Sequence, residues 1–226
     1  MKRYCEALLR LIYPASCAVC RDLLELNEES LCAACSAQLA ALCFAPEEAV
    51  LHERFEAVDD GWALYPYESP AREILSAVKF LKKRWLMRVF RRDLEPLAAA
   101  IAAENHYDFL VPVPIDGKKL LTREFNQSEI AAGLLSDCTR IPVAARVLRK
   151  KAATPSQSRL SREERLVNLT RAFDVRNTAG VRGKSVLLVD DIVTTGATAE
   201  EAARTLKASG ARRVDLFAIA RAGDGR

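Results

Sequence analysis

One segment, SVLLVDDIVTTGATAEEAARTL at residues 185–206, constrains the fold of this chain more than any other. Its uninterrupted apolar run, residues 186–189, is typical of a strand that is covered on both faces of a sheet. Two adjacent carboxylates, Asp190 and Asp191, end that run, and burying them without partners would cost several kcal/mol. We therefore expect both to face solvent, a partner or a ligand at the carboxyl edge of a sheet, where ligands bind in open α/β folds.

The residues that follow the two acids predict a phosphate site. The run Thr-Thr-Gly-Ala-Thr at 194–198 allows a tight turn, because Gly196 can adopt a positive φ. Backbone N–H groups then point into one concavity at a helix N-terminus, where a phosphate dianion binds, and Thr194, Thr195 and Thr198 add hydroxyl donors. The upstream carboxylates accept hydrogen bonds and suit a vicinal diol. This combination predicts a ribose 5-phosphate site. It is neither a Walker loop nor a dinucleotide fingerprint, because G-K-S/T and G-x-G-x-x-G are absent.

Four of the seven cysteines have the spacing of metal ligands. They form two Cys-x-x-Cys pairs, CAVC and CAAC, at Cys17, Cys20, Cys32 and Cys35. Two such pairs complete a tetrahedral zinc site, and because all four positions would bind the metal, we expect this zinc to be structural. The 11 residues between the pairs suffice for a short hairpin. Two alternatives stay open: a redox pair of thiols, or small buried cysteines.

The rest of the chain predicts strands that alternate with helices. We expect Ser69 to cap the first helix of the body and Phe80 or Leu81 to complete its apolar face, and Asn126 to cap a later helix. Such alternation indicates an α/β fold with a mostly parallel sheet flanked by helices. The expected strands are 62–67, 107–116, 145–150, 171–175, 185–191 and 212–221, and the expected helices are two within 69–104, one at 125–138 and one at 198–210.

Charge is unevenly distributed along the chain. The net charge is +4, but residues 1–70 carry −7 and the remainder carries +11. Residues 71–92 hold eight basic side chains and one acidic one, with Phe80 and Trp85 among them. Basic and aromatic side chains together are typical of grooves for single-stranded nucleic acid. The alternative is an amphipathic helix with a solvated basic face.

The composition also bears on localisation. Half of the residues are apolar, so the chain can bury a sizeable core. No run of about 18 uncharged apolar residues occurs, so we expect no membrane-spanning segment. The first residues make a poor secretory signal, because Glu6 and Arg10 interrupt their apolar run. We therefore expect a cytoplasmic protein.

Several motifs resemble a known family. VLLVDDIVTTGAT closely resembles the phosphoribosyl pyrophosphate (PRPP) signature of type I phosphoribosyltransferases. YESPAREILSAVKF, VPVPIDGKKLLTREFNQSEIA and TPSQSRLSREERLVNLTRAF resemble the ComF family, competence-protein-F-like phosphoribosyltransferases with an N-terminal zinc module. With the cysteine pairs, the resemblance covers nearly the whole chain. It implies a Rossmann-like type I phosphoribosyltransferase domain at 69–226, preceded by a zinc-ribbon-like module at 1–46 and by a linker with a first strand at 47–68.

The resemblance implies an activity as well. A nitrogen nucleophile would displace pyrophosphate from C1 of Mg²⁺-bound PRPP through an oxocarbenium-like transition state. Asp190 and Asp191 would hold the ribose hydroxyls and stabilise the developing cation. Arg123, Lys150 and Lys151 would neutralise the leaving pyrophosphate, together with Mg²⁺. The residues expected to bind PRPP or a related ribose 5-phosphate are Asp190, Asp191, Val193, Thr194, Thr195, Gly196, Ala197 and Thr198.

Two further implications concern the loops around the site. The turn after FLVPVP corresponds to the pyrophosphate loop of the family, and residues 149–168 correspond to a mobile loop that closes over the substrate. Family members commonly have a glycine where this chain has Glu124. A carboxylate near pyrophosphate would repel it, so Glu124 either points away or weakens binding.

Three functions stay open. The first is transfer of phosphoribosyl to an acceptor that the sequence does not identify, because no aromatic residue follows Phe217 to stack on a base. The second is a non-catalytic PRPP- or nucleotide-sensing protein that binds single-stranded DNA during the DNA uptake to which the ComF resemblance points. The third is an adaptor that docks a protein of the competence machinery through the zinc module. A homodimer is also left open.

Overall fold

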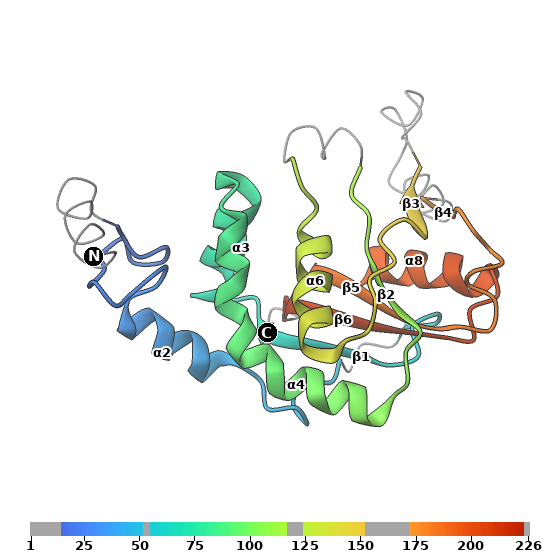
Figure 1. Ribbon diagram of the computed structural model, residues 1–226, viewed down its shortest axis with the longest axis horizontal. Helices are drawn as coiled ribbons and strands as arrows, with labels where there is room; N and C mark the ends of the chain where they lie inside the picture. Colours follow the sequence, from blue (N-terminus) through green and yellow to red (C-terminus); the bar gives the residue numbers. More distant parts are fainter. Residues whose placement is uncertain (1–14, 52–54, 117–123, 152–171, 224–226) are drawn as a thin grey trace.

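Figure 1 shows the computed structural model, which describes residues 15–51, 55–116, 124–151 and 172–223. A four-stranded parallel sheet with strand order β1-β6-β5-β2 forms its centre. The two central strands are buried on both faces, which agrees with their continuous apolar runs. The expected parallel sheet is therefore confirmed. Its strands are β1 (Gly61–Pro66), β2 (Phe109–Pro112), β5 (Ser185–Val193) and β6 (Arg213–Arg221).

Helices cover both faces of this sheet (Figure 1). Because side chains alternate along a strand, Leu187 and Val189 of β5 pack into one core cluster with three of the helices. Val186 and Leu188 pack into a second cluster with the fourth helix, α8 (Ala197–Ala208). The first cluster contains side chains of α3 (Ala71–Leu81), α4 (Arg91–Glu104) and α6 (Gln127–Thr139), and the 3₁₀ helix η1 (Arg84–Phe90) connects the first two. Leu39 of α2 (Ala33–Leu42) also belongs to this cluster.

Smaller elements lie at the two ends of the long axis (Figure 1). The cysteine pairs and α2 (Ala33–Leu42) are at one end. A two-stranded antiparallel sheet of β3 (Leu148–Lys150) and β4 (Phe173–Val175) is at the other, beside α8. None of the helices in the described part of the chain combines the length and the apolar character that crossing a bilayer requires.

Two expectations about α3 are wrong. Pro70 rather than Ser69 is the N-cap residue, and its backbone is already helical, so no side chain caps this helix. Phe80 and Leu81 are 70% and 53% exposed, because the last turn of α3 extends beyond the core. By contrast, the predicted cap of α6 is confirmed, since the side chain of Asn126 accepts a hydrogen bond from the backbone N–H of Ser128 at 3.2 Å.

Candidate phosphate-binding site and metal centre

The predicted phosphate loop, residues 194–198, follows β5 and includes the first residues of α8, at the carboxyl edge of the sheet. Gly196 is the N-cap of α8 and has a φ of 70°, the left-handed conformation that glycine adopts without strain. A small cavity opens at this turn, lined by Asp190 and by residues 192–199. The first backbone N–H groups of α8 therefore border the cavity that the sequence predicts to hold phosphate. Among the residues expected to bind PRPP, Val193 also belongs to the core: it is 3% exposed, and its side chain packs into the second core cluster.

The two acids lie within β5, close to its carboxyl end. The strand was expected to end at Asp191, and it extends two residues further, to Val193. Asp190 is 9% exposed, and one oxygen of its carboxylate accepts hydrogen bonds from the Ser128 hydroxyl and from the Asp191 backbone N–H, both at 2.9 Å. Asp191 is only half-buried and accepts from the Ile192 N–H at 3.0 Å. The first acid is thus held by the protein, and the second is more open.

Burial controls the protonation of Asp190. Desolvation raises the pKa of this carboxyl well above its usual value, and the negative charge of Asp191 raises it further. The hydrogen bonds from Ser128 and from the Asp191 backbone act in the opposite direction. The two adjacent acids therefore differ in their environments, which is the usual way for a site to separate the roles of paired carboxylates.

The N-terminus of α6 contributes residues to the site that the sequence did not identify. Asn126 is buried, and its side-chain amide donates to the Val113 carbonyl at 2.9 Å, which holds α6 against the end of β2. This contact brings Ser128 to Asp190. Gln127 is 1% exposed, and its side-chain nitrogen has no hydrogen-bond partner among the described residues. These residues stand in the sequence as the FNQS stretch, but only the order of the strands in the sheet places them beside Asp190.

Of the expected pyrophosphate residues, Lys150 and Lys151 lie within the described residues and Arg123 does not. Arg123 and most of the expected closing loop, residues 149–168, fall outside the described ranges. Lys150 lies on β3 with its ammonium group 5.5 Å from the ring centroid of Phe173. Lys151 lies just after the end of this strand.

Glu124 has a specific place in the structure. Its φ is 69°, which explains why glycine suits this position. Its carboxylate forms an ion pair with the ammonium group of Lys82, which lies just after α3. The negative charge that departs from the family pattern is therefore paired with a lysine.

The four cysteines come together as the spacing predicts. Their sulfur atoms all lie within 4.8 Å of one another, and those of Cys20 and Cys32 are 3.6 Å apart. A tetrahedral zinc with Zn–S bonds of 2.3 Å would place sulfur atoms about 3.8 Å apart. The donor set and its spacing therefore fit a structural zinc ion that takes all four thiolates.

The local fold explains how each pair is presented. The first pair lies on a knuckle in which the Cys17 N–H donates to the Asp22 carbonyl at 2.8 Å. The second pair starts α2, with Cys32 as its N-cap. Although burial acts to raise it, the pKa of Cys17 is lowered to about 6, because backbone N–H groups of Cys32, Val19 and Cys20 stabilise its thiolate. A thiolate is the form that binds metal.

Comparisons with known proteins identify the family of this chain. The family model for the phosphoribosyl transferase domain matches residues 99–226. Competence protein ComFC of Bacillus subtilis (strain 168) is 31% identical over 160 residues, which cover 70% of this chain but only 63% of that relative. Competence protein F of Haemophilus influenzae is 26% identical over 224 residues, covering 91% of this chain and 96% of the relative. DNA utilization protein YhgH of Salmonella typhimurium is 27% identical over 232 residues, covering 93% and 99%. The chain therefore belongs to the phosphoribosyl transferase domain family and, within it, to the ComF family of competence and DNA utilization proteins.

Proposed function

We propose that this protein binds PRPP and transfers its phosphoribosyl group to a nitrogen acceptor, with release of pyrophosphate. One observation carries the proposal: Asp190 and the phosphate loop line the same cavity, in a chain of the phosphoribosyl transferase domain family. Neither carboxylates nor a phosphate cradle alone would select this ligand. Together they match a ribose that carries a 5-phosphate and two free hydroxyls.

The 5-phosphate and the ribose hydroxyls each have a counterpart in the described residues. The 5-phosphate would accept hydrogen bonds from the N–H groups at the start of α8 and from the threonine hydroxyls of the loop. Asp191 and Asp190 would accept from the 2- and 3-hydroxyls, and their charge would stabilise the cation that develops at C1. These hydrogen bonds favour the ionised carboxylate, so ligand binding would lower the raised pKa of Asp190.

The leaving pyrophosphate needs positive charge. We assign this role to Arg123, Lys150 and Lys151, which follow the family pattern. Mg²⁺ bound with PRPP would supply further positive charge to the pyrophosphate oxygens. The ion pair with Lys82 would keep the Glu124 carboxylate from repelling that group.

The cysteine cluster has a separate role in this proposal. It would hold one structural zinc in a module of residues 1–46, joined to the transferase domain of residues 69–226 by residues 47–68. All four thiolates would bind the metal, leaving no open position for substrate. The zinc would therefore stabilise the module rather than take part in the reaction.

Turnover can be tested by measuring pyrophosphate release. The zinc-loaded protein would be incubated with PRPP, Mg²⁺ and a set of acceptors that includes ammonia, primary amines and the nucleobases. We expect release with at least one acceptor and loss of release in Asp191→Asn, because that variant removes the charge nearest to solvent. PRPP binding without release for any acceptor would contradict the catalytic part and favour a sensor.

A second candidate function is binding of single-stranded DNA, and one observation favours it. Phe80, Leu81 and Trp85 are 70%, 53% and 54% exposed, and they lie in the most basic segment of the chain. Exposed aromatic rings within a cationic surface allow bases to stack while the backbone phosphates are neutralised. We define this surface as the α3–η1 patch, formed by Lys79, Phe80, Leu81, Lys82, Lys83, Arg84 and Trp85.

This candidate predicts a specific pattern of losses. Fluorescence anisotropy with a labelled oligothymidine would compare the parent with Lys83→Ala/Arg84→Ala and with Trp85→Ala. Removing two charges should lower the salt slope by about two times 0.7, and removing the ring should weaken binding without changing the slope. Arg176→Ala/Arg182→Ala, which removes equal charge from exposed positions elsewhere, is the matched control. Equal losses in both double variants would argue against a DNA site at the α3–η1 patch.

A further inference from the structure

Residues 55–60 form a segment that lies along α8 and reaches the phosphate loop. The chain leaves the sheet edge at Leu51, whose N–H donates to the Gly61 carbonyl at 2.8 Å, and it rejoins that edge at Gly61 to begin β1. Between these points, the 55–60 segment contacts both ends of α8. None of its residues was expected to bind the ligand.

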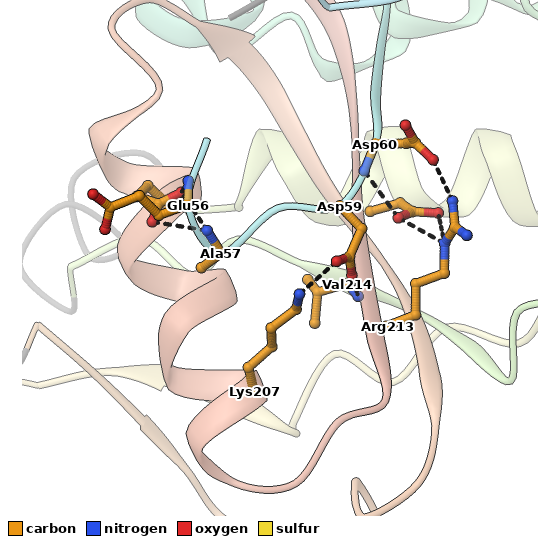
Figure 2. Close-up of polar contacts among 9 residues, drawn as sticks. Glu56, Ala57, Asp59, Asp60, Lys207, Arg213 and Val214 are labelled. Carbon is orange, nitrogen blue, oxygen red and sulfur yellow. Dashed lines mark hydrogen bonds and ion pairs between the residues drawn. The ribbon is translucent and has the colours of Figure 1, made fainter. Parts of the chain in front are cut away.

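The end of the segment that is far from the phosphate loop is held by charge. Asp59 accepts from the Lys207 ammonium group at 2.6 Å and from the Val214 N–H at 2.9 Å. Asp60 forms an ion pair with Arg213. Figure 2 shows both acids directed at these partners on α8 and β6. Because backbone and side-chain contacts combine here, this end of the segment has a defined position.

The other end is held by the first turn of α8. The backbone N–H groups of Glu56 and Ala57 donate to the carboxylate of Glu200 at 3.1 and 3.0 Å (Figure 2). Arg204 forms ion pairs with Glu56 at 3.2 Å and with Glu200 at 3.0 Å. Glu200 lies one turn after Gly196, so the segment is attached to the helix whose N-terminus forms the phosphate loop.

Phe55 contacts the phosphate loop itself. A Cβ atom placed on Gly196 would lie 2.2 Å from Cε1 of the Phe55 ring and 2.9 Å from Cζ. These distances are far inside van der Waals contact, so the ring occupies the space that a side chain at position 196 would need. Phe55 is half-buried and packs against the second core cluster, which holds the ring in place. Gly196 is thus required both by its positive φ and by Phe55.

We propose that Phe55 is a positioning residue for the phosphate loop: its ring, anchored through the adjacent contacts with Glu200, fixes Gly196 so that the loop keeps the shape that receives a phosphate monoester. This inference rests on the proposed function, because it concerns the same loop. Thermodynamic coupling is reciprocal: if docking of the 55–60 segment favours ligand binding, ligand binding favours docking by the same factor. Ligand in the loop therefore stabilises the docked 55–60 segment, and docking of the segment favours ligand binding.

A double-mutant cycle tests this contact. Calorimetric titration with PRPP and Mg²⁺, and separately with ribose 5-phosphate, would compare wild type, Phe55→Ala, Gly196→Ala and the double variant. We expect Phe55→Ala to weaken the binding of both ligands about fivefold or more. Phe55→Leu should retain most of the affinity. Gly196→Ala should weaken ligand binding strongly in the wild-type background and less strongly in the Phe55→Ala background, because the clash with the ring is absent there. Coupling of about fivefold between the two changes is expected for residues in contact.

Phe109→Ala separates positioning from general loss of stability. Phe109 is also half-buried against the second core cluster, but it begins β2 at the opposite edge of the sheet. We expect both Phe→Ala changes to lower the Tm and only Phe55→Ala to lower affinity. Hydrogen exchange should also slow at the Glu56 and Ala57 amides of wild type when PRPP is added.

The outcomes distinguish this inference from the proposed function. If wild type binds neither ligand, the proposed function fails and the inference fails with it. If wild type binds and Phe55→Ala binds equally well, or if the two changes are additive in the cycle, the inference alone is overturned. Loss of affinity in Phe109→Ala equal to that in Phe55→Ala would also overturn it.

Discussion

Asp190 is buried in the middle of a strand, with a hydroxyl and a backbone N–H both donating to one of its oxygens. An ionised carboxylate in this position is costly, because the two hydrogen bonds only partly replace water and Asp191 lies next to it. Residues that serve a ligand are often unfavourable for stability in this way. At the residue scale, Asp190 is therefore where stability and ligand binding oppose each other.

The raised pKa of Asp190 predicts how Asp190→Asn affects stability. A carboxyl whose pKa is raised by folding stabilises the protein at low pH, where it is protonated, and this contribution is lost as the pH rises through the folded pKa. Asn does not ionise, so Asp190→Asn does not lose this stability as the pH rises. The variant should therefore have a higher Tm than wild type at pH 7.5, by about 2–4 °C for each kcal/mol gained. At pH 4, near the ordinary carboxyl pKa, the difference should be smaller. Differential scanning calorimetry at the two pH values measures both. A variant that is less stable than wild type at pH 7.5 would show that Asp190 is not strained by burial.

Local sequence predicts several helices and strands of this protein, but not the contacts between elements that are distant in the chain. The strand–loop–helix unit from β5 to α8 was predicted from an apolar run, small loop residues and a helical pattern, and the Asn126 cap of α6 was predicted as well. The burial of Asp190 was not predicted, because the partner that makes this carboxyl tolerable within the strand is Ser128, 62 residues away. The contact of Phe55 with Gly196 was missed for the same reason. Contacts of this kind depend on the strand order, which no local pattern contains.

The end of α6 offers a prediction at the same scale. Arg140 is the C-cap residue of α6, with a φ of 64°. An L-residue in this left-handed conformation costs roughly 1–2 kcal/mol, whereas glycine adopts it readily. After allowance for the larger entropy of glycine in the unfolded chain, Arg140→Gly should stabilise the protein by about 0.5–1 kcal/mol. Urea denaturation measures the change, with Arg140→Ala as the control that removes the side chain but keeps the strain. Equal midpoints for the glycine and alanine variants would contradict this account.

At the scale of the whole molecule, the cysteine cluster and the phosphate loop are separate sites. The cysteines lie at one end of the long axis, whereas α8 lies towards the other (Figure 1). The spacing of the cysteines predicted their clustering, because two short Cys-x-x-Cys turns need only be brought together to complete a tetrahedron. The two sites should therefore respond separately to mutation.

This separation predicts the effect of removing zinc. Cys17→Ser should reduce the zinc content from about one ion per chain to below about one tenth and lower the Tm, because metal binding contributes directly to the folding of such modules. Cys138→Ser, which changes a cysteine outside the cluster, should retain the zinc. Metal analysis and calorimetry on the two variants check both statements. Full zinc content in Cys17→Ser would contradict the four-thiolate site.

Asp190, Asp191 and the phosphate loop are proposed to form one site for PRPP. Isothermal titration of the zinc-loaded protein with PRPP, with and without Mg²⁺, tests this most directly, with Asp190→Asn/Asp191→Asn measured in parallel. We expect binding that depends on Mg²⁺ and is lost in the double variant, while circular dichroism shows that the double variant is still folded. Absence of binding in wild type, or equal binding in the double variant, would contradict it.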